Sequence, residues 1–172
     1  CIRDRLELNA VRERLGEALG VDFGFGENIS NRPISDLQIS FKVCSNAQEA
    51  AGALMSMGDS PTPVAMLPGV HGDQGELTGI AVTDGEKTWW ISSALLVVGE
   101  VSDALGGLLS ADGPGLATHH AKPLVRLLLR MGLATEKLVI DTALAAYLLD
   151  PSESSYELTA LMEEHSGERL PE

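Results

Sequence analysis

The sequence has few cysteines, few aromatic residues and no long apolar run. Only 2 of its 172 residues are cysteine, Cys1 and Cys44. Two cysteines cannot build a disulfide framework or a cysteine-rich metal cluster, so we expect a protein of the reducing cytoplasm. No run reaches the roughly 18 apolar residues that a membrane span needs, and the first residues do not resemble a signal peptide. Because the first residue is Cys1 rather than Met, we expect the chain to be a piece of a longer protein.

Basic side chains are also scarce. The chain has 12 Lys and Arg residues against 25 Asp and Glu residues, which gives a net charge of −13. Affinity for nucleic acid rests largely on basic side chains that neutralise phosphates, so we do not expect this chain to bind DNA strongly by itself. The hydrophobic fraction of 44% and the length are typical of one globular domain with a substantial core.

Two segments differ in their patterning. Residues 3–19 place Leu8, Val11 and Leu15 at helical spacing, and Gly20 ends this expected helix. Residues 20–35 have no periodicity and are typical of a linker. We therefore expect a helix and linker over residues 1–35 and one folded domain over residues 36–172.

The pattern of the second segment predicts an α/β fold, a mixed sheet flanked by helices. Ser45 and Gln48 are spaced as a capping box for a helix that ends at Met57, and Asp84-Gly85 predicts a hairpin turn. The expected strands are 37–43, 64–67, 77–83, 87–92, 116–119 and 137–140, and the expected helices between and after them include 102–109 and 122–131.

The segment His119–Gly167 carries the most specific pattern. Lys122–Met131 is apolar at helical spacing and Gly132 is a helix stop. Asp141 is placed to cap a helix that carries Leu144, Tyr147 and Leu148 on one face and ends before Pro151.

The exact residues of this segment resemble the 3′–5′ exonuclease-like domain of bacterial DNA polymerase I, a family A polymerase, in its actinobacterial form. The resemblance lies in His-His-Ala-Lys-Pro from residue 119, in Asp-Thr-Ala-Leu-Ala-Ala-Tyr-Leu-Leu-Asp-Pro from residue 141, and in Ser-Tyr-Glu-Leu from residue 155. It implies a ribonuclease H-like fold. It also implies a 5′ nuclease domain before this one, to which residues 1–35 would belong, and a Mg²⁺-dependent DNA polymerase domain after it. The parent would be a nucleotidyltransferase of DNA replication and repair that holds DNA.

Members of this family that proofread hydrolyse DNA with two divalent metal ions held by four carboxylates. The resemblance places the first two carboxylates on Leu67 and Gly69, the third on Leu124 with a partner asparagine on His120, and the fourth beyond Glu172. No carboxylate occupies the positions within the chain. We therefore expect a vestigial site with no catalytic residue, no bound metal and no cofactor of its own; residues that contact DNA are not assigned.

Other acidic and histidine side chains are poor substitutes for these metal ligands. Asp73 and Glu76 belong to a Gly-rich hairpin and are typical of solvated turns, whereas Asp141 is more typical of a helix cap. A zinc site at His71, His119 and His120 is disfavoured, because adjacent residues at a strand end point to opposite faces. Trp89 and Trp90 should alternate likewise, with one in the core and one exposed or at a domain contact.

The sequence therefore favours an inactive middle domain that acts as a scaffold for the polymerase domain. Two alternatives stay open. One is an active metal-dependent 3′–5′ proofreading exonuclease, and the other is an independent acidic interaction module unrelated to polymerases.

Overall fold

The computed structural model describes residues 35–36, 40–71, 76–153 and 155–170. The expected helix 3–19, nearly all of the linker and residues 37–39 of the first expected strand lie outside the described residues. Within the described part of the chain, no helix has both the length and the apolar character needed to cross a membrane.

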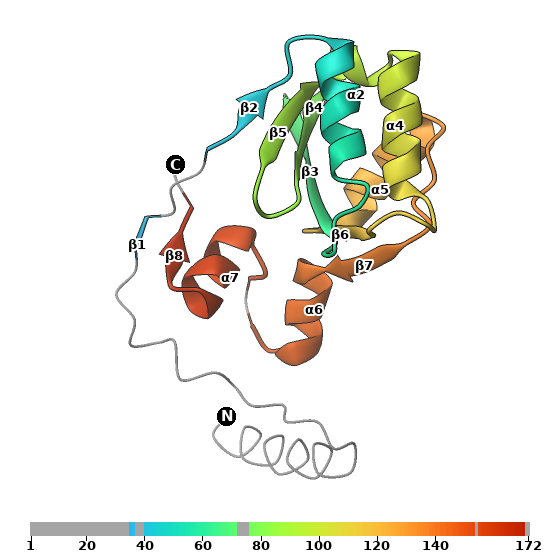
Figure 1. The fold of residues 1–172 in the computed structure, drawn as a ribbon. Helices are drawn as coiled ribbons and strands as arrows, with labels where there is room; N and C mark the ends of the chain where they lie inside the picture. The colour runs from blue at the N-terminus through green and yellow to red at the C-terminus, as the bar shows by residue number, and fades with distance from the viewer. Residues whose placement is uncertain (1–34, 37–39, 72–75, 154, 171–172) are drawn as a thin grey trace.

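A six-stranded mixed sheet forms the centre of the fold, with strand order β2-β5-β4-β3-β6-β7 (Figure 1). β3, β4 and β5 pair antiparallel, whereas β2 pairs parallel with β5, β6 with β3, and β7 with β6. The strands are β2 Lys42–Val43, β3 Val64–His71, β4 Glu76–Thr83, β5 Thr88–Ser92, β6 Leu116–Thr118 and β7 Leu138–Asp141. A separate parallel pair joins β1, Ser35–Asp36, to β8, Glu168–Arg169. The expected mixed sheet is confirmed.

Helices follow the strands in the expected order. They are α2 Ala47–Ser56, α3 Ser93–Leu96, α4 Gly99–Leu109, α5 Ala121–Arg130, α6 Thr142–Leu149 and α7 Leu158–His165. Gly132 ends α5 with φ +79°, and Gly85 turns the β4–β5 hairpin with φ +95°, both backbone conformations that suit glycine. The short α3 was not expected, because four residues carry too little periodicity to signal a helix.

The predicted start of α2 was wrong by one residue. Asn46, and not Ser45, is the N-cap, and its side chain accepts the backbone N–H of Glu49 at 2.9 Å. The Glu49 carboxylate in turn accepts the N–H of Ser45 at 2.8 Å. The N–H of Cys44 donates to the Trp90 carbonyl at 3.0 Å. Because this hydrogen bond holds the backbone at Cys44 beside β5, the helix begins only after Asn46.

The core lies between one face of the sheet and the helices α2, α4 and α5. Figure 1 shows α2 and α4 side by side against the sheet. Alternate strand residues supply the sheet side of this core: Val64, Met66, Ile80, Val82 and Ile91 are all at most 1% exposed. Trp89 packs against the same core, as one of the two tryptophans was expected to do. Successive residues point to opposite faces, so Leu67, Gly69 and Trp90 lie on the other face of the sheet.

Candidate functional site

The candidate site lies where the parallel strands β3, β6 and β7 end. Their carboxyl ends meet at one edge of the sheet. Thr118, the last residue of β6, ties this edge together because its hydroxyl donates to the Met66 carbonyl at 2.7 Å. The vestigial positions on β3, the two histidines after β6 and Asp141 at the end of β7 are thereby brought to the same edge.

The Trp90 ring covers the β3 positions. Leu67 pairs with Ala81, and Ala81 with Trp90, so these three side chains share one face of the sheet. The indole leans across two glycines: a Cβ on Gly79 would lie 2.6 Å from Trp90 Cζ2, and one on Gly69 would lie 3.0 Å from Trp90 Cζ3 and closer still to Cη2. Real side chains do not approach so closely. The Thr78 hydroxyl oxygen would lie 2.9 Å from the same Cβ position, so a side chain at residue 69 fits only if both Trp90 and Thr78 move.

The Asp141 carboxylate joins the first turns of two helices. Oδ1 accepts the backbone N–H groups of His120 at 3.0 Å, Ala143 at 3.1 Å and Leu144 at 3.4 Å, and Oδ2 accepts that of Ala121 at 2.7 Å. Burial acts to raise the pKa of Asp141, but these backbone hydrogen bonds outweigh it and hold the pKa below its ordinary value. The predicted cap of α6 is confirmed, and the same carboxylate also caps α5.

The two histidines lie together, contrary to the prediction that they point to opposite faces. His120 adopts a left-handed conformation with φ +56°, so the strand alternation ends before it. The rings of His119 and His120 meet edge to face with centroids 4.4 Å apart. His119 Nδ1 lies 2.9 Å from the Thr142 hydroxyl, while its Nε2 is buried without a hydrogen-bond partner among the described residues. Burial, and then the neighbouring His120, lower the pKa of His119.

Leu124 lies in the hydrophobic core and not at a solvent-facing site. It is 0% exposed and belongs to the same cluster as Leu128, one turn later on α5. The position that the resemblance assigns to the third carboxylate is therefore a packing position in this chain.

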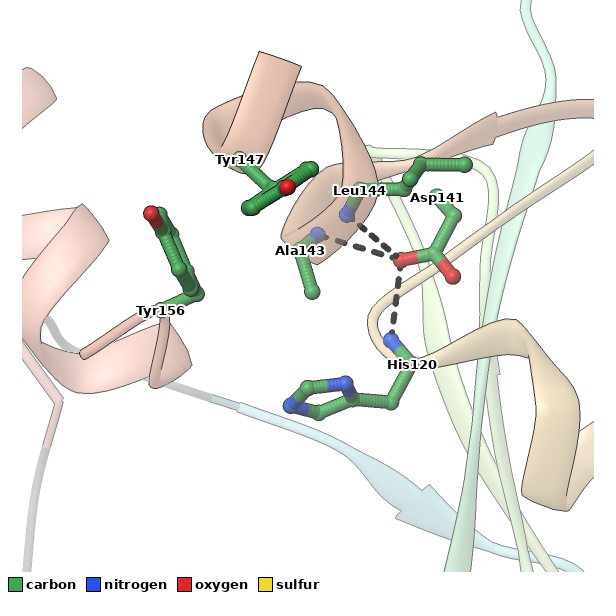
Figure 2. A pocket seen from close by; sticks show the side chains of 6 residues that line it. All are labelled: His120, Asp141, Ala143, Leu144, Tyr147 and Tyr156. Atoms are coloured by element: carbon green, nitrogen blue, oxygen red, sulfur yellow. Dashed lines mark hydrogen bonds between the residues drawn. The ribbon is translucent and has the colours of Figure 1, made fainter. Parts of the chain in front are cut away.

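An open pocket of about 330 Å³ lies beside the two helix starts (Figure 2). Figure 2 shows the rings of His120, Tyr147 and Tyr156 around this space, with Ala143, Leu144 and Asp141 completing the lining. The tyrosine rings meet edge to face with centroids 5.8 Å apart, and the Tyr156 hydroxyl donates to the Asp150 carbonyl at 2.8 Å. No pattern in the sequence assigns either tyrosine to a pocket, although both lie within the segments that carry the resemblance.

Other candidate ligands do not gather. Glu76 is exposed at the start of β4, opposite the exposed His71 at the end of β3, and Asp73 lies outside the described residues. Cys44 is buried, and burial raises the pKa of its thiol. In the ranges that the structure describes, no group of three or more His, Cys, Asp or Glu side chains could hold a metal ion.

A family model described as "DNA polymerase I, ribonuclease H-like domain" matches residues 69–171. The chain belongs to this family. Among curated relatives, the DNA polymerase I proteins of Mycobacterium tuberculosis and Mycobacterium bovis are each 27% identical over 164 residues, which cover 92% of this chain and 17% of the relative. The chain therefore spans about a sixth of the length of the relatives it matches.

Solved structures agree with this assignment. The chain is similar to a structure described as the POL domain of Pol1 from M. smegmatis with DNA primer-template and dNTP, at 26% identity and a TM-score of 0.62, over 76% of this chain and 23% of that chain. Escherichia coli RNase D, an exoribonuclease, matches over 77% of this chain and 35% of that chain, with a TM-score of 0.65. At 18% identity this second likeness shows the fold alone. The expected family and the ribonuclease H-like fold are both confirmed.

Proposed function

We propose that this chain is the middle domain of a DNA polymerase I whose 3′–5′ exonuclease fold has lost its metal-binding carboxylates and serves as a scaffold for the polymerase domain. The family match and the mycobacterial relatives support the placement within such an enzyme. In the parent, a 5′ nuclease domain precedes this domain. The polymerase domain follows, holds DNA and uses Mg²⁺ in replication and repair in the cytoplasm.

The position of Trp90 carries this proposal. A two-metal nuclease needs a carboxylate at residue 69 that reaches into open space beside β3. In this chain the Trp90 indole fills that space and also covers Gly79, where a Cβ would meet both the ring and the Ile91 backbone carbonyl. Gly69 and Trp90 therefore fit one another as a packed surface, which the loss of a ligand alone would not require.

The remaining side chains do not fit a pair of divalent ions. Two close cations need several anionic oxygens to offset their mutual repulsion. Leu67 offers none, and Leu124 is enclosed in the core. Asp141, which caps both helices at this edge, already accepts four backbone N–H groups. Because those N–H groups stabilise its charge, moving it to a metal would leave the starts of both helices without a cap.

The active proofreading exonuclease would require ligands from other parts of the parent. Neither the donor set nor the packing at this edge favours it. The independent acidic module is disfavoured by the family match, which covers most of the folded segment.

The test is metal binding together with nuclease activity. Mn²⁺ is titrated calorimetrically into the purified chain and into its full parent, and each is incubated with single-stranded DNA labelled at the 5′ end. We expect no saturable micromolar binding in the chain, and no stepwise 3′ shortening by either protein. A proofreading relative that keeps all four carboxylates is the positive control. Shortening by the parent that is lost in Asp141→Asn or Glu76→Gln, with polymerase activity retained, would overturn the proposal.

A further inference from the structure

The imidazole of His119 lies at the junction of β6 and α6. Its Nδ1 is 2.9 Å from the hydroxyl oxygen of Thr142, the first residue of α6. That hydroxyl donates to the carbonyl of Thr118, the last residue of β6, at 3.4 Å. A hydroxyl carries one proton, so Thr142 accepts from His119, and the ring proton of the neutral imidazole lies on Nδ1. The His119 ring and the Thr142 hydroxyl thereby join the end of a strand to the start of a helix.

The other ring nitrogen of His119, Nε2, is then a bare acceptor. It is buried and has no hydrogen-bond partner among the described residues. A proton added to Nε2 would create a buried, charged N–H group without an acceptor, which is a costly arrangement. Because the side chain as a whole is only half-buried, a rotation of the ring brings Nε2 to water. The neutral ring therefore keeps its place, whereas the charged ring leaves it.

Three titratable side chains act on this ring from the elements around it: His120 after β6, Asp141 at the end of β7 and Glu157 at the start of α7. Among the described residues, none of them accepts a hydrogen bond from Nε2. Asp141 is occupied by four backbone N–H groups, and Glu157 is exposed to water, which screens its charge. Burial and then His120 lower the pKa of His119, and the two carboxylates do not reverse this. The neutral ring is therefore the folded form near neutral pH and is lost as the pH falls.

His119 also holds the ring of His120 in place. The two rings meet edge to face with centroids 4.4 Å apart, and His120 lines the pocket together with Tyr147 and Tyr156 (Figure 2). The backbone N–H of His120 is bound by Asp141 at 3.0 Å. Asp141 stays ionised through mildly acidic pH, because its pKa lies below its ordinary value. A rotation of His119 therefore leaves the helix caps in place and changes the pocket wall.

We propose that His119 and His120 form an acid-sensitive latch beside the pocket. Neutral His119 holds the closed arrangement, in which it donates to Thr142 and supports the His120 ring against the pocket. A proton on Nε2 turns His119 outward, releases the Thr142 hydroxyl and frees the His120 ring from the pocket wall. The latch goes beyond the proposed function and does not rest on it, because neither a metal ion nor DNA takes part.

NMR of the 172-residue chain with ¹⁵N-labelled histidine tests the latch. The chain has 4 histidines, so single His→Gln variants assign the ring signals. At about pH 7.5 we expect His119 to carry its proton on Nδ1 alone and to show a nuclear Overhauser effect to the His120 ring. As the pH falls below the ordinary value of 6.5, Nε2 should take up a proton and this effect should be lost. The ring signals of Tyr147 should shift along the same titration curve, while tryptophan fluorescence stays constant.

Variants of Thr142 separate the hydroxyl from the shape of the side chain. Thr142→Val removes the hydroxyl, so the fixed proton position on His119 and its contact with His120 should already be lost at about pH 7.5. Thr142→Ser keeps the hydroxyl and should behave as the unmodified chain does. Thr159→Val, at an exposed threonine of α7, is the matched control. Thermal melts show that each variant folds, and the titration of the unmodified chain decides the question if Thr142→Val does not.

Four results would overturn the inference. A proton on Nε2 of neutral His119 would reverse the direction of the hydrogen bond to Thr142. A charged His119 that keeps its contact with His120 would show that the ring does not turn. Loss of this contact together with a change in tryptophan fluorescence would show that acid unfolds the whole domain. Equal spectra of folded Thr142→Val and Thr142→Ser would show that the hydroxyl does not hold the ring.

Discussion

The carboxylate of Asp141 accepts the backbone N–H of Ala121 at 2.7 Å, which joins the start of α5 to a residue 20 positions later in the chain. The other oxygen of the same carboxylate caps α6. One acid therefore fixes the relative position of two helices at the candidate site.

Asp141→Ala should lower the free energy of unfolding by about 1–3 kcal/mol, because a single lost helix cap costs about 0.5–2 kcal/mol and here two helices lose one. The free energy of unfolding of Asp141→Asn should lie between those of Asp141→Ala and the parent sequence. The asparagine amide oxygen can still cap α6, but its NH₂ group cannot accept the N–H of Ala121. Urea unfolding followed by circular dichroism measures both. Asp112→Ala, at an exposed turn, is the control and should change little. Equal stability of Asp141→Ala and the parent sequence would contradict this role.

His119 should make stability depend on pH near neutrality. Its pKa is lowered by burial, then by His120, and the opposing charges of Asp141 and Glu157 do not reverse this. The unfolded state then binds the proton more readily than the folded state, so stability falls as pH drops below the ordinary value of 6.5 and levels off below the folded pKa.

Thermal melts between about pH 7.5 and pH 5 measure this slope of stability against pH. Few other side chains titrate in that range. His119→Gln should flatten it. His165→Gln, an exposed histidine at the end of α7, should leave it in place. A slope that survives His119→Gln would assign the effect to another group.

Gly69→Ala should destabilise the domain by about 1–3 kcal/mol, because the added methyl group meets the Trp90 ring. Gly52→Ala is the matched control: nothing lies within 4 Å of its Cβ position on α2, and the change should be neutral or stabilise by up to about 1 kcal/mol. In a Trp90→Ala background the cost of Gly69→Ala should become smaller, because the Thr78 hydroxyl is then the remaining close neighbour of the added methyl group. A double-mutant cycle in urea measures that coupling. Additive costs would show that the ring does not occupy the space.

Leu124→Asp should cost about 3–5 kcal/mol, because it leaves an unpaired charge in the core. Leu129→Asp on the same helix is exposed and should cost about 1 kcal/mol or less. Neither variant should gain Mn²⁺ affinity or nuclease activity. A folded Leu124→Asp variant with saturable metal binding would show that the site can be rebuilt.

Local elements followed from local sequence. The helix 122–131 and its glycine stop, the Asp84-Gly85 hairpin and the cap at Asp141 all depend on residues within one or two turns of each other, and each was predicted close to its observed bounds. The cap of α2 was misplaced because Ser45-Gln48 and Asn46-Glu49 have the same spacing. The choice between them depends on the bond from Cys44 to Trp90, which lies 46 residues away in the chain.

At the candidate site, the sequence by itself determined which atoms are present. Whatever fold the chain adopts, no carboxylate is present at Leu67, Gly69 or Leu124, because the ligand atoms are a property of the side chain. Only the tertiary structure decided that Trp90 fills the space over Gly69, that His119 and His120 meet, and that Asp141 serves two helices at once. These relationships join residues 20 or more positions apart or depend on one left-handed backbone angle, and neither is encoded in local periodicity. The exposed apolar side chains of β7 and α6 show the same division, since these residues are apparent in the sequence but their exposure is a property of the fold.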